Sequence, residues 1–282
     1  MPYETAEQKI RIFFRKAAPS LLGKGDLWEE VVSRAGVKII SKVTNSNTEA
    51  YLLSESSLIV KDKGIVLATC GATRLLGTLE FLLASLPLEN ISQMLFSLFT
   101  HGRTLQAFPP FWADCKLLDD YVKKYNCRRN YFINGLFSGL AIEASFAGSH
   151  PILGYEICIN NSGIELKGFL KNGSRSEIRS ALIPPMILKG YVIDDYIFDP
   201  PGYSLNAISE SRYVFMHISP EADSGIVTME ADSLSPEEKS ILIEELKFLY
   251  RSNSIHIQSS GEIVTRSVQA YNPQGFFKEG QI

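Results

Sequence analysis

The sequence predicts an α+β fold, a four-layer αββα sandwich of two antiparallel sheets that is internally duplicated. Two stretches carry the same order of elements, four short strands and then one helix, within 37–86 and from about 189 onward. The strands are rich in Val, Ile, Leu and Tyr and are separated by turn residues, which is typical of hairpins. Sheets with helices on one face can bury their bare faces against each other. With 282 residues, 45% of them hydrophobic, the chain can form such a core, and we expect residues 1–282 to be a single domain.

The first stretch consists of short apolar runs followed by an amphipathic segment. Its strands are expected at 37–43, 49–54, 57–61 and 64–69. A helix is expected at 71–86, where Leu recurs at intervals of three and four residues, and Pro87 ends it.

The second stretch repeats this order. Its strands are expected at about 189–198, 203–208, 212–219 and 225–230. The following helix begins at Ser235, which forms a capping box with Glu238, and Pro236 occupies the first helical position.

The remaining segments complete the expected fold. We expect an N-terminal helix from Glu4 to about Lys16, and a second from Asp26 to Ala35 that is capped by Asp26. Between the two stretches we expect a helix at 114–126, strands at 129–139, 142–147 and 153–159, and a flexible loop from Asn172 to Ile183.

Composition and charge exclude several classes of partner. The net charge of -3 and the pI of about 5.9 do not indicate a nucleic-acid-binding protein. The sequence also has no cluster of Lys and Arg that would indicate binding to a membrane surface. No apolar run could span a bilayer and the N-terminus lacks a secretory pattern, so we expect a cytoplasmic protein. The four cysteines occur singly, without histidines at ligand spacing, which predicts neither disulfides nor a metal site.

A polar tetrad, Ser54-Glu55-Ser56-Ser57, interrupts what would otherwise be one apolar strand. A serine hydroxyl can attack the adjacent carbonyl and convert the Glu55-Ser56 peptide into an ester. Elimination from that ester would leave a pyruvoyl group in place of Ser56. A ketone of this kind is the electron sink that decarboxylation of an α-amino acid requires, because no ordinary side chain supplies one.

The joint order and spacing of several segments resemble the eukaryotic-type S-adenosylmethionine decarboxylases. The segments are Tyr3-Glu4 with Glu7, the region 51–60, Thr69-Cys70-Gly71, the region 198–206, and His217 to Glu221. The resemblance implies the same αββα fold and the decarboxylation of S-adenosylmethionine, which supplies the aminopropyl donor for spermidine and spermine. It also implies self-cleavage into a β chain of residues 1–55 and an α chain of residues 56–282.

The resemblance further assigns catalytic roles. The pyruvoyl group made from Ser56 would form a Schiff base with the substrate amine, without PLP or metal. Cys70 matches the proton donor, and Ser204 and His217 match the residues that stabilise the cyclic processing intermediate and remove its α proton. Glu4 and Glu7 match acidic residues of the family that contribute to catalysis.

The resemblance also assigns binding residues. Tyr3 and Phe198 match two rings that stack on the adenine, Glu221 matches the carboxylate that holds the ribose, and Leu53 offers backbone contacts. Some members of the family bind putrescine in an acidic pocket, for which Glu7, Asp114, Glu165 and Glu230 are candidates. Gln8, Asn161 and Gly163 depart from that pocket, so we expect no strong stimulation by putrescine.

Other interpretations compete with this one. Ser56 could lie in an ordinary turn, and Cys70 and His217 could be buried core residues. A thiol hydrolase built on Cys70 and His217 lacks a Gly-x-Cys elbow and a third orienting residue. The main alternative is an inactive relative that regulates an active decarboxylase, against which the joint presence of Ser56, Cys70, Ser204 and His217 argues. A sheet edge could mediate a homodimer, but no segment identifies one.

Overall fold

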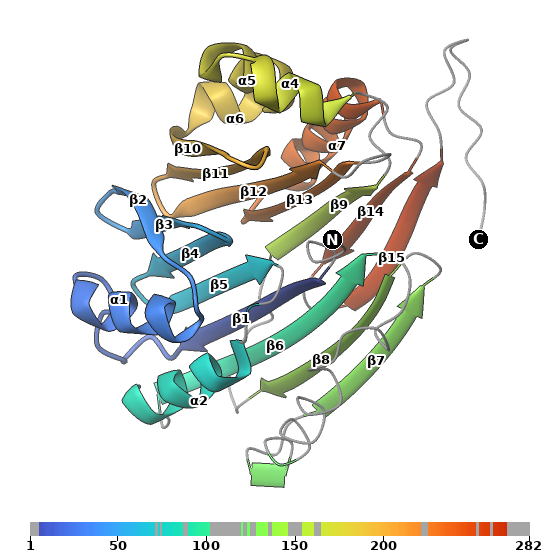
Figure 1. Cartoon of the computed structure of the whole chain (residues 1–282). Helices are drawn as coiled ribbons and strands as arrows, with labels where there is room; N and C mark the ends of the chain where they lie inside the picture. Colours follow the sequence, from blue (N-terminus) through green and yellow to red (C-terminus); the bar gives the residue numbers. More distant parts are fainter. Residues whose placement is uncertain are drawn as a thin grey trace. The chain divides into compact units, whose positions relative to one another are not determined.

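The fold is known from a computed structural model of the chain (Figure 1). The structure describes residues 6–70, 73, 75–86, 90–101, 120, 123–124, 128–134, 137–145, 154–160, 165–220, 225–251, 254–259 and 262–269. The chain forms two compact units, residues 1–150 and 151–282, each built around one antiparallel sheet with helices. The predicted α+β class with two antiparallel sheets is therefore confirmed.

Unit 1 contains an eight-stranded sheet with the order β2-β3-β4-β5-β1-β6-β8-β7. The elements of this unit are β1 (Ala6–Phe14), α1 (Gly25–Arg34), β2 (Ile39–Thr44), β3 (Thr48–Leu53), β4 (Ser56–Lys61), β5 (Gly64–Cys70), α2 (Leu75–Ser85), β6 (Ile91–His101), β7 (Arg128–Asn134) and β8 (Phe137–Ser145).

Unit 2 contains a seven-stranded sheet with the order β10-β11-β12-β13-β9-β14-β15. Its elements are β9 (Gly154–Asn160), α4 (Leu166–Asn172), α5 (Arg175–Leu182), α6 (Pro185–Gly190), β10 (Val192–Phe198), β11 (Gly202–Ser209), β12 (Arg212–Pro220), β13 (Gly225–Asp232), α7 (Pro236–Tyr250), β14 (Ser254–Ser259) and β15 (Glu262–Gln269).

The two units repeat one topology. In each, a four-stranded meander (β2 to β5, or β10 to β13) is followed by a helix, and the strand that precedes the meander in sequence pairs with its last strand. The strand after the helix then pairs with that preceding strand, so β1 corresponds to β9 and β6 to β14. The order predicted for both stretches is present, and the duplication extends beyond it to the central strands.

The predicted N-terminal helix from Glu4 to Lys16 is wrong, because the described part of this segment is strand β1. It pairs with β5 on one side and with β6 on the other. Its residues alternate in period two: Ile10 and Ile12 join the apolar core, whereas Lys9 and Arg11 belong to the opposite face.

Further boundaries differ from the prediction. Residues 175–182 of the expected loop form α5, because Ser174 and Glu177 make a capping box that starts a helix there. Asp26 lies in the first turn of α1 and is not the cap, which is Lys24 without a side-chain bond. The expected strand 129–139 spans the β7-β8 hairpin, and residues 189–190 belong to α6. Most of the expected helix 114–126 lies outside the described residues.

Each sheet has an apolar face that its own helices cover. In unit 1 this core includes Ile10 of β1, Trp28 of α1 and Leu79 of α2. In unit 2 it includes Leu205 of β11 and Leu242 of α7. Among the described helices, none is long and apolar enough to cross a membrane. Glu7 and Cys70 of unit 1, and Ser204 and His217 of unit 2, alternate with core residues of their strands and so belong to the other face of each sheet.

Candidate active site

The predicted cleavage point lies at the hairpin between β3 and β4. Leu53 and Ser56 are paired across it, so Ser54 and Glu55 form the turn. Ser54 is tied to Lys38, whose main-chain N–H donates to the Ser54 hydroxyl at 3.1 Å and whose carbonyl accepts from Ser54 N at 2.8 Å. The turn is thereby fixed from outside the hairpin.

Ser56 has an unusual backbone. Its φ is +121°, a value that residues other than glycine rarely adopt, and the residue is only 2% exposed. Such strain persists only where surrounding contacts impose it, and it concentrates at functional sites. The peptide bond that precedes Ser56 is the one that the sequence predicts to break.

The carbonyl of that same peptide bond accepts a hydrogen bond from a neighbouring strand. The main-chain N–H of Cys70 donates to the Glu55 oxygen at 3.0 Å. A donor aimed at a carbonyl that is under attack stabilises the oxyanion that forms there. The contact comes from the backbone, so it does not depend on the Cys70 side chain.

Cys70 ends β5 and lies directly opposite Glu7 of β1. The thiol side chain and the carboxylate are both buried, with exposures of 5% and 2%. Oε1 of Glu7 is 2.8 Å from Nζ of Lys9, which is itself buried. The strand register thus places this buried ion pair on the strand next to Cys70.

A hydrogen-bond network links Thr73 and the start of α2 to β1 and to the end of β5. The Gln8 side-chain oxygen accepts from Leu75 N at 3.0 Å, and its amide nitrogen donates to the Thr73 carbonyl. Thr73 Oγ1 is 2.6 Å from Thr69 Oγ1 and donates to the Cys70 carbonyl at 3.2 Å. Gln8 therefore anchors the start of α2 to β1, a role that sequence reasoning missed because it treated the residue only as a departure from a pocket.

In unit 2, Ser204 of β11 and His217 of β12 are paired across the sheet. Ser204 Oγ lies 2.7 Å from Nδ1 of His217, and Ser219 Oγ lies 3.0 Å from Nε2. Burial of the ring lowers the pKa of His217 to about 4, which keeps the imidazole neutral near pH 7. A neutral imidazole keeps a lone pair on one ring nitrogen and can act as a base.

Sequence reasoning paired Ser204 with His217 but missed Ser219. The signal was available, because Ser219 lies two residues after His217 and strand alternation places both on one face. Phe198, at the end of β10, has its ring 6.4 Å from the His217 ring and 4.9 Å from that of Tyr196. Three predicted residues, Phe198, Ser204 and His217, are thus neighbours in unit 2.

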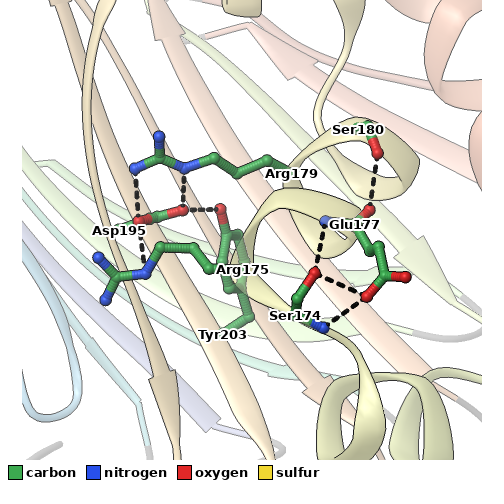
Figure 2. Close-up of polar contacts among 7 residues, drawn as sticks. All are labelled: Ser174, Arg175, Glu177, Arg179, Ser180, Asp195 and Tyr203. Atoms are coloured by element: carbon green, nitrogen blue, oxygen red, sulfur yellow. Dashed lines mark hydrogen bonds and ion pairs between the residues drawn. The ribbon is translucent and has the colours of Figure 1, made fainter.

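The strands that carry these residues are held to α5 by an ionic network (Figure 2). Asp195 of β10, whose side chain is fully buried, accepts two bonds from Arg179, at 2.6 and 2.8 Å. Tyr203 OH donates to the same carboxylate at 2.7 Å, and Arg175 approaches it at 3.5 Å. Asp195 precedes Phe198 by three residues and Tyr203 precedes Ser204, so this network supports the edge strand β10 and its neighbour β11.

Two candidates for the activator pocket, Glu230 and Glu165, differ in burial. Glu230 of β13 is fully buried and accepts from Tyr213 OH at 2.8 Å. Glu165 is exposed and caps α4 by accepting from Gly168 N. Tyr3, Glu4, Asp114 and Glu221 lie outside the described residues. Within the part of the chain that the structure describes, no group of three or more His, Cys, Asp or Glu side chains could hold a metal ion.

Comparison with solved structures identifies the class of fold. A crystal structure of the Trypanosoma brucei AdoMetDC-delta26 monomer superposes with a TM-score of 0.52, covering 71% of this chain and 78% of that one at 16% identity. Two antiparallel sheets with helices, arranged in this topology, are therefore shared with a known α+β fold.

Sequence comparison gives the family. The family model described as adenosylmethionine decarboxylase matches residues 2–132 and 168–276. S-adenosylmethionine decarboxylase proenzyme 3 of Arabidopsis thaliana is 28% identical over 246 residues, covering 78% of this chain and 70% of the relative. The proenzyme of Catharanthus roseus is 28% identical over 264 residues, covering 86% and 72%. The chain belongs to the adenosylmethionine decarboxylase family.

Proposed function

We propose that this protein is a self-processing, pyruvoyl-dependent S-adenosylmethionine decarboxylase that supplies the aminopropyl donor for spermidine and spermine synthesis. The observation that carries the proposal is the Glu55-Ser56 junction. Its serine has a φ of +121° and its carbonyl accepts a hydrogen bond from Cys70 N. The strained backbone torsion of Ser56 and the donor on the Glu55 oxygen both favour attack on that carbonyl.

Processing would begin when Ser56 Oγ attacks the Glu55 carbonyl carbon. The Cys70 N–H and the Ser204 hydroxyl would stabilise the resulting oxyanion, and the C–N bond would break to leave an ester and a free Ser56 amine. His217 would then remove the α proton of Ser56 as the ester C–O bond breaks, which releases the Glu55 carboxylate and a dehydroalanine. Tautomerisation to an imine and addition of water would release ammonia and leave a pyruvoyl group at the start of residues 56–282.

The pyruvoyl group would serve as the electron sink for decarboxylation, in the place of PLP. The chain's own residues would then bind the substrate and return a proton. Cys70 would donate that proton to Cα, assisted by the acids Glu4 and Glu7. Tyr3 and Phe198 would stack on the adenine and attract the sulfonium, Glu221 would hold the ribose, and Leu53 would offer its backbone.

We expect no strong stimulation by putrescine. A dication needs uncompensated negative charge, and the Glu7 carboxylate already has the Lys9 ammonium 2.8 Å away. The exposed Glu165 is engaged in capping α4. A homodimer that pairs through a sheet edge is compatible with this account, because β2 and β10 end their sheets.

A carbon dioxide release assay tests the proposed function directly. Purified protein without a partner is incubated with S-adenosylmethionine labelled in its carboxyl group, and the labelled gas is collected. We expect release by the wild-type protein and by Ser57→Ala, but not by Ser56→Ala. A wild-type protein that releases no label alone, and does so only with an added active decarboxylase, would instead support the regulatory alternative.

A further inference from the structure

The main-chain N–H that bonds the Glu55 carbonyl lies at the end of a strand. The last pair between β4 and β5 is Ser56 with Thr69, so Cys70 lies one residue beyond it. Cys70 is also the terminal pair between β5 and β1, where it is opposite Glu7. The ends of strands open more easily than their interiors, because fewer neighbours hold them. Strand pairing alone therefore leaves this donor at a weakly held position.

Thr73 brackets the peptide unit that carries this N–H. Its Oγ1 is 2.6 Å from Thr69 Oγ1 and donates to the Cys70 carbonyl at 3.2 Å. A hydroxyl has one hydrogen, so Thr73, which gives its own to Cys70, must accept from Thr69. One buried side chain thus contacts both residues of the Thr69-Cys70 peptide, on either side of the donor N–H.

Gln8 in turn holds Thr73 in place. Its side-chain nitrogen donates to the Thr73 carbonyl, and its oxygen accepts from Leu75 N at 3.0 Å. Gln8 is 1% exposed and pairs with Thr69 across the β1-β5 ladder. By strand alternation both belong to the sheet face of the apolar core, whereas the Cys70 side chain belongs to the other face. The Thr73 hydroxyl can thus be removed without a change on the thiol side of the sheet.

We propose that Thr73 is a positioning residue for chain cleavage: its hydroxyl, supported by Gln8, fixes the end of β5 so that the Cys70 N–H stays on the Glu55 carbonyl. This inference rests on the proposed function, because it assumes that cleavage occurs at that carbonyl. Without the hydroxyl, the end of β5 can move away from the β3-β4 turn. The oxyanion then loses part of the stabilisation that a preorganised donor gives.

The proposal predicts that the first step of processing slows. Thr73→Val keeps the shape of the side chain and removes its hydroxyl. Attack of Ser56 on the Glu55 carbonyl should then be slower by roughly three- to tenfold, the effect of losing one hydrogen bond. The later elimination does not use this donor, so the uncleaved amide should accumulate and the ester should not.

Time courses of freshly translated precursor test this prediction. Samples are split at each time point, and one half is treated with hydroxylamine, which cleaves the ester but leaves the amide intact. Thr73→Val should accumulate the hydroxylamine-resistant chain, and Thr73→Ser, which keeps the hydroxyl, should cleave near the wild-type rate. If Thr73→Val fails to fold, Gln8→Met takes its place, because it removes the contacts that hold Thr73 and has the same expected result.

Thr78→Val is the matched control. It removes the buried hydroxyl of another threonine in unit 1, within α2, for which the described residues offer no hydrogen-bond partner. Its cleavage rate should equal that of the wild-type chain. A Thr78→Val chain as slow as Thr73→Val would overturn the inference, because loss of any buried hydroxyl in this region would then have the same effect.

Amide hydrogen exchange gives a readout that does not depend on cleavage. The Ser56→Ala protein is labelled with ¹⁵N-cysteine, and the Cys70 signal is assigned from its loss in Cys70→Ala, since the chain has four cysteines. When Thr73→Val is added, exchange of the Cys70 amide should speed up by roughly three- to tenfold, whereas the other cysteine amides should not change. Addition of Thr78→Val should leave every cysteine amide unchanged.

The outcomes separate the two proposals. If the wild-type chain cleaves and Thr73→Val cleaves equally fast, Thr73 has no positioning role although the proposed function stands. An unchanged Cys70 exchange rate, or an equal increase at all cysteine amides, would also overturn the inference, because the hydroxyl would then not act on this donor in particular. A wild-type chain that never cleaves between Glu55 and Ser56 would refute the proposed function, and this inference with it.

Discussion

The two units hold their reactive groups by different means. In unit 1 the Glu55-Ser56 junction is shaped by the backbone, through a positive φ at Ser56 and a main-chain N–H from Cys70. In unit 2 Ser204, His217 and Ser219 lie in regular strands and are held by bonds between side chains. Backbone contacts survive most substitutions, whereas side-chain contacts do not. Processing should therefore tolerate side-chain changes at Cys70 but not at His217.

The largest effect on activity that distinguishes backbone contacts from side-chain contacts is expected for Cys70→Ala. The alanine keeps the main-chain N–H that bonds Glu55, so self-cleavage should continue. It removes the thiol, so turnover should fall by roughly 10²- to 10⁴-fold, the usual contribution of a positioned acid. Cleavage is measured on denaturing gels and turnover by release of labelled carbon dioxide. A folded Cys70→Ala protein that no longer cleaves would show that the thiol itself is needed for processing.

A second comparison concerns the Asp195 network, which joins the edge strand β10 of unit 2 to β11 and α5. Asp195→Ala leaves the partly exposed Arg179 and the buried Tyr203 hydroxyl without their shared acceptor, and the loss of hydrogen bonds of this kind costs about 1–3 kcal/mol. Urea unfolding would be measured in the uncleaved Ser56→Ala background, so that chain cleavage does not alter the reference state. Asp194→Ala, at the adjacent and partly buried position, is the control and should cost less than about 1 kcal/mol. Equal losses in the two variants would contradict the assigned role.

The same carboxylate gives a pH dependence with a definite sign. Desolvation alone would raise the pKa of Asp195, but hydrogen bonds from Arg179 and Tyr203 outweigh it and the pKa is lowered. The group then contributes stability that is present above its unfolded pKa of about 3.9 and is lost as pH falls below that value. Asp195→Ala should therefore remove part of the acid sensitivity of unfolding.

Helix capping provides a smaller contrast between the units. Ser235 closes a capping box with Glu238 at α7, whereas Lys24 at the start of α1 makes no side-chain cap. Ser235→Ala should cost about 1 kcal/mol of unfolding free energy, and Lys24→Ala should cost close to nothing. Thermal melting of the two variants in the Ser56→Ala background would measure the difference. A Lys24→Ala loss as large as that of Ser235→Ala would show that α1 depends on a contact beyond its cap.

The smallest effect is expected for pH on processing. Because burial lowers the pKa of His217 to about 4, the ring remains neutral and basic well below the usual histidine range. The cleavage rate should change by less than about twofold between roughly pH 5.5 and 7.5, as far as this histidine controls it. The cleavage rate of freshly translated precursor, measured at several pH values, tests this expectation. A fall with a midpoint near 6.5 would indicate a ring with an ordinary pKa.

Local sequence signals predicted the meanders of both units well, because short apolar runs separated by turn residues are direct indications of hairpins. They failed at β1, where Glu7, Gln8, Lys9 and Arg11 are all buried although polar. A central strand of this kind is stabilised by pairing with β5 and β6, far away in sequence, and no local pattern reports that. The α5 helix was missed for the opposite reason, because Gly173 and Ser174 were interpreted as a loop although Ser174 caps a helix.

The candidate site was predictable in its residue types but not in its geometry. The serine tetrad and the resemblance identified Ser56, Cys70, Ser204 and His217 as candidates. The bond from Cys70 N to the Glu55 carbonyl follows from strand register, which the sequence does not give. Ser219 follows from alternation along β12, but becomes noticeable only once its hydroxyl is found beside the His217 ring.

Intact mass spectrometry of the purified protein under denaturing conditions tests the central claim most directly. We predict two chains, residues 1–55 and residues 56–282, the second lighter by one ammonia than its encoded sequence. That mass would establish both the cleavage point and the pyruvoyl group at Ser56. A single uncleaved chain of 282 residues would contradict the account, because the Glu55-Ser56 bond would then remain intact and the proposed electron sink would be missing.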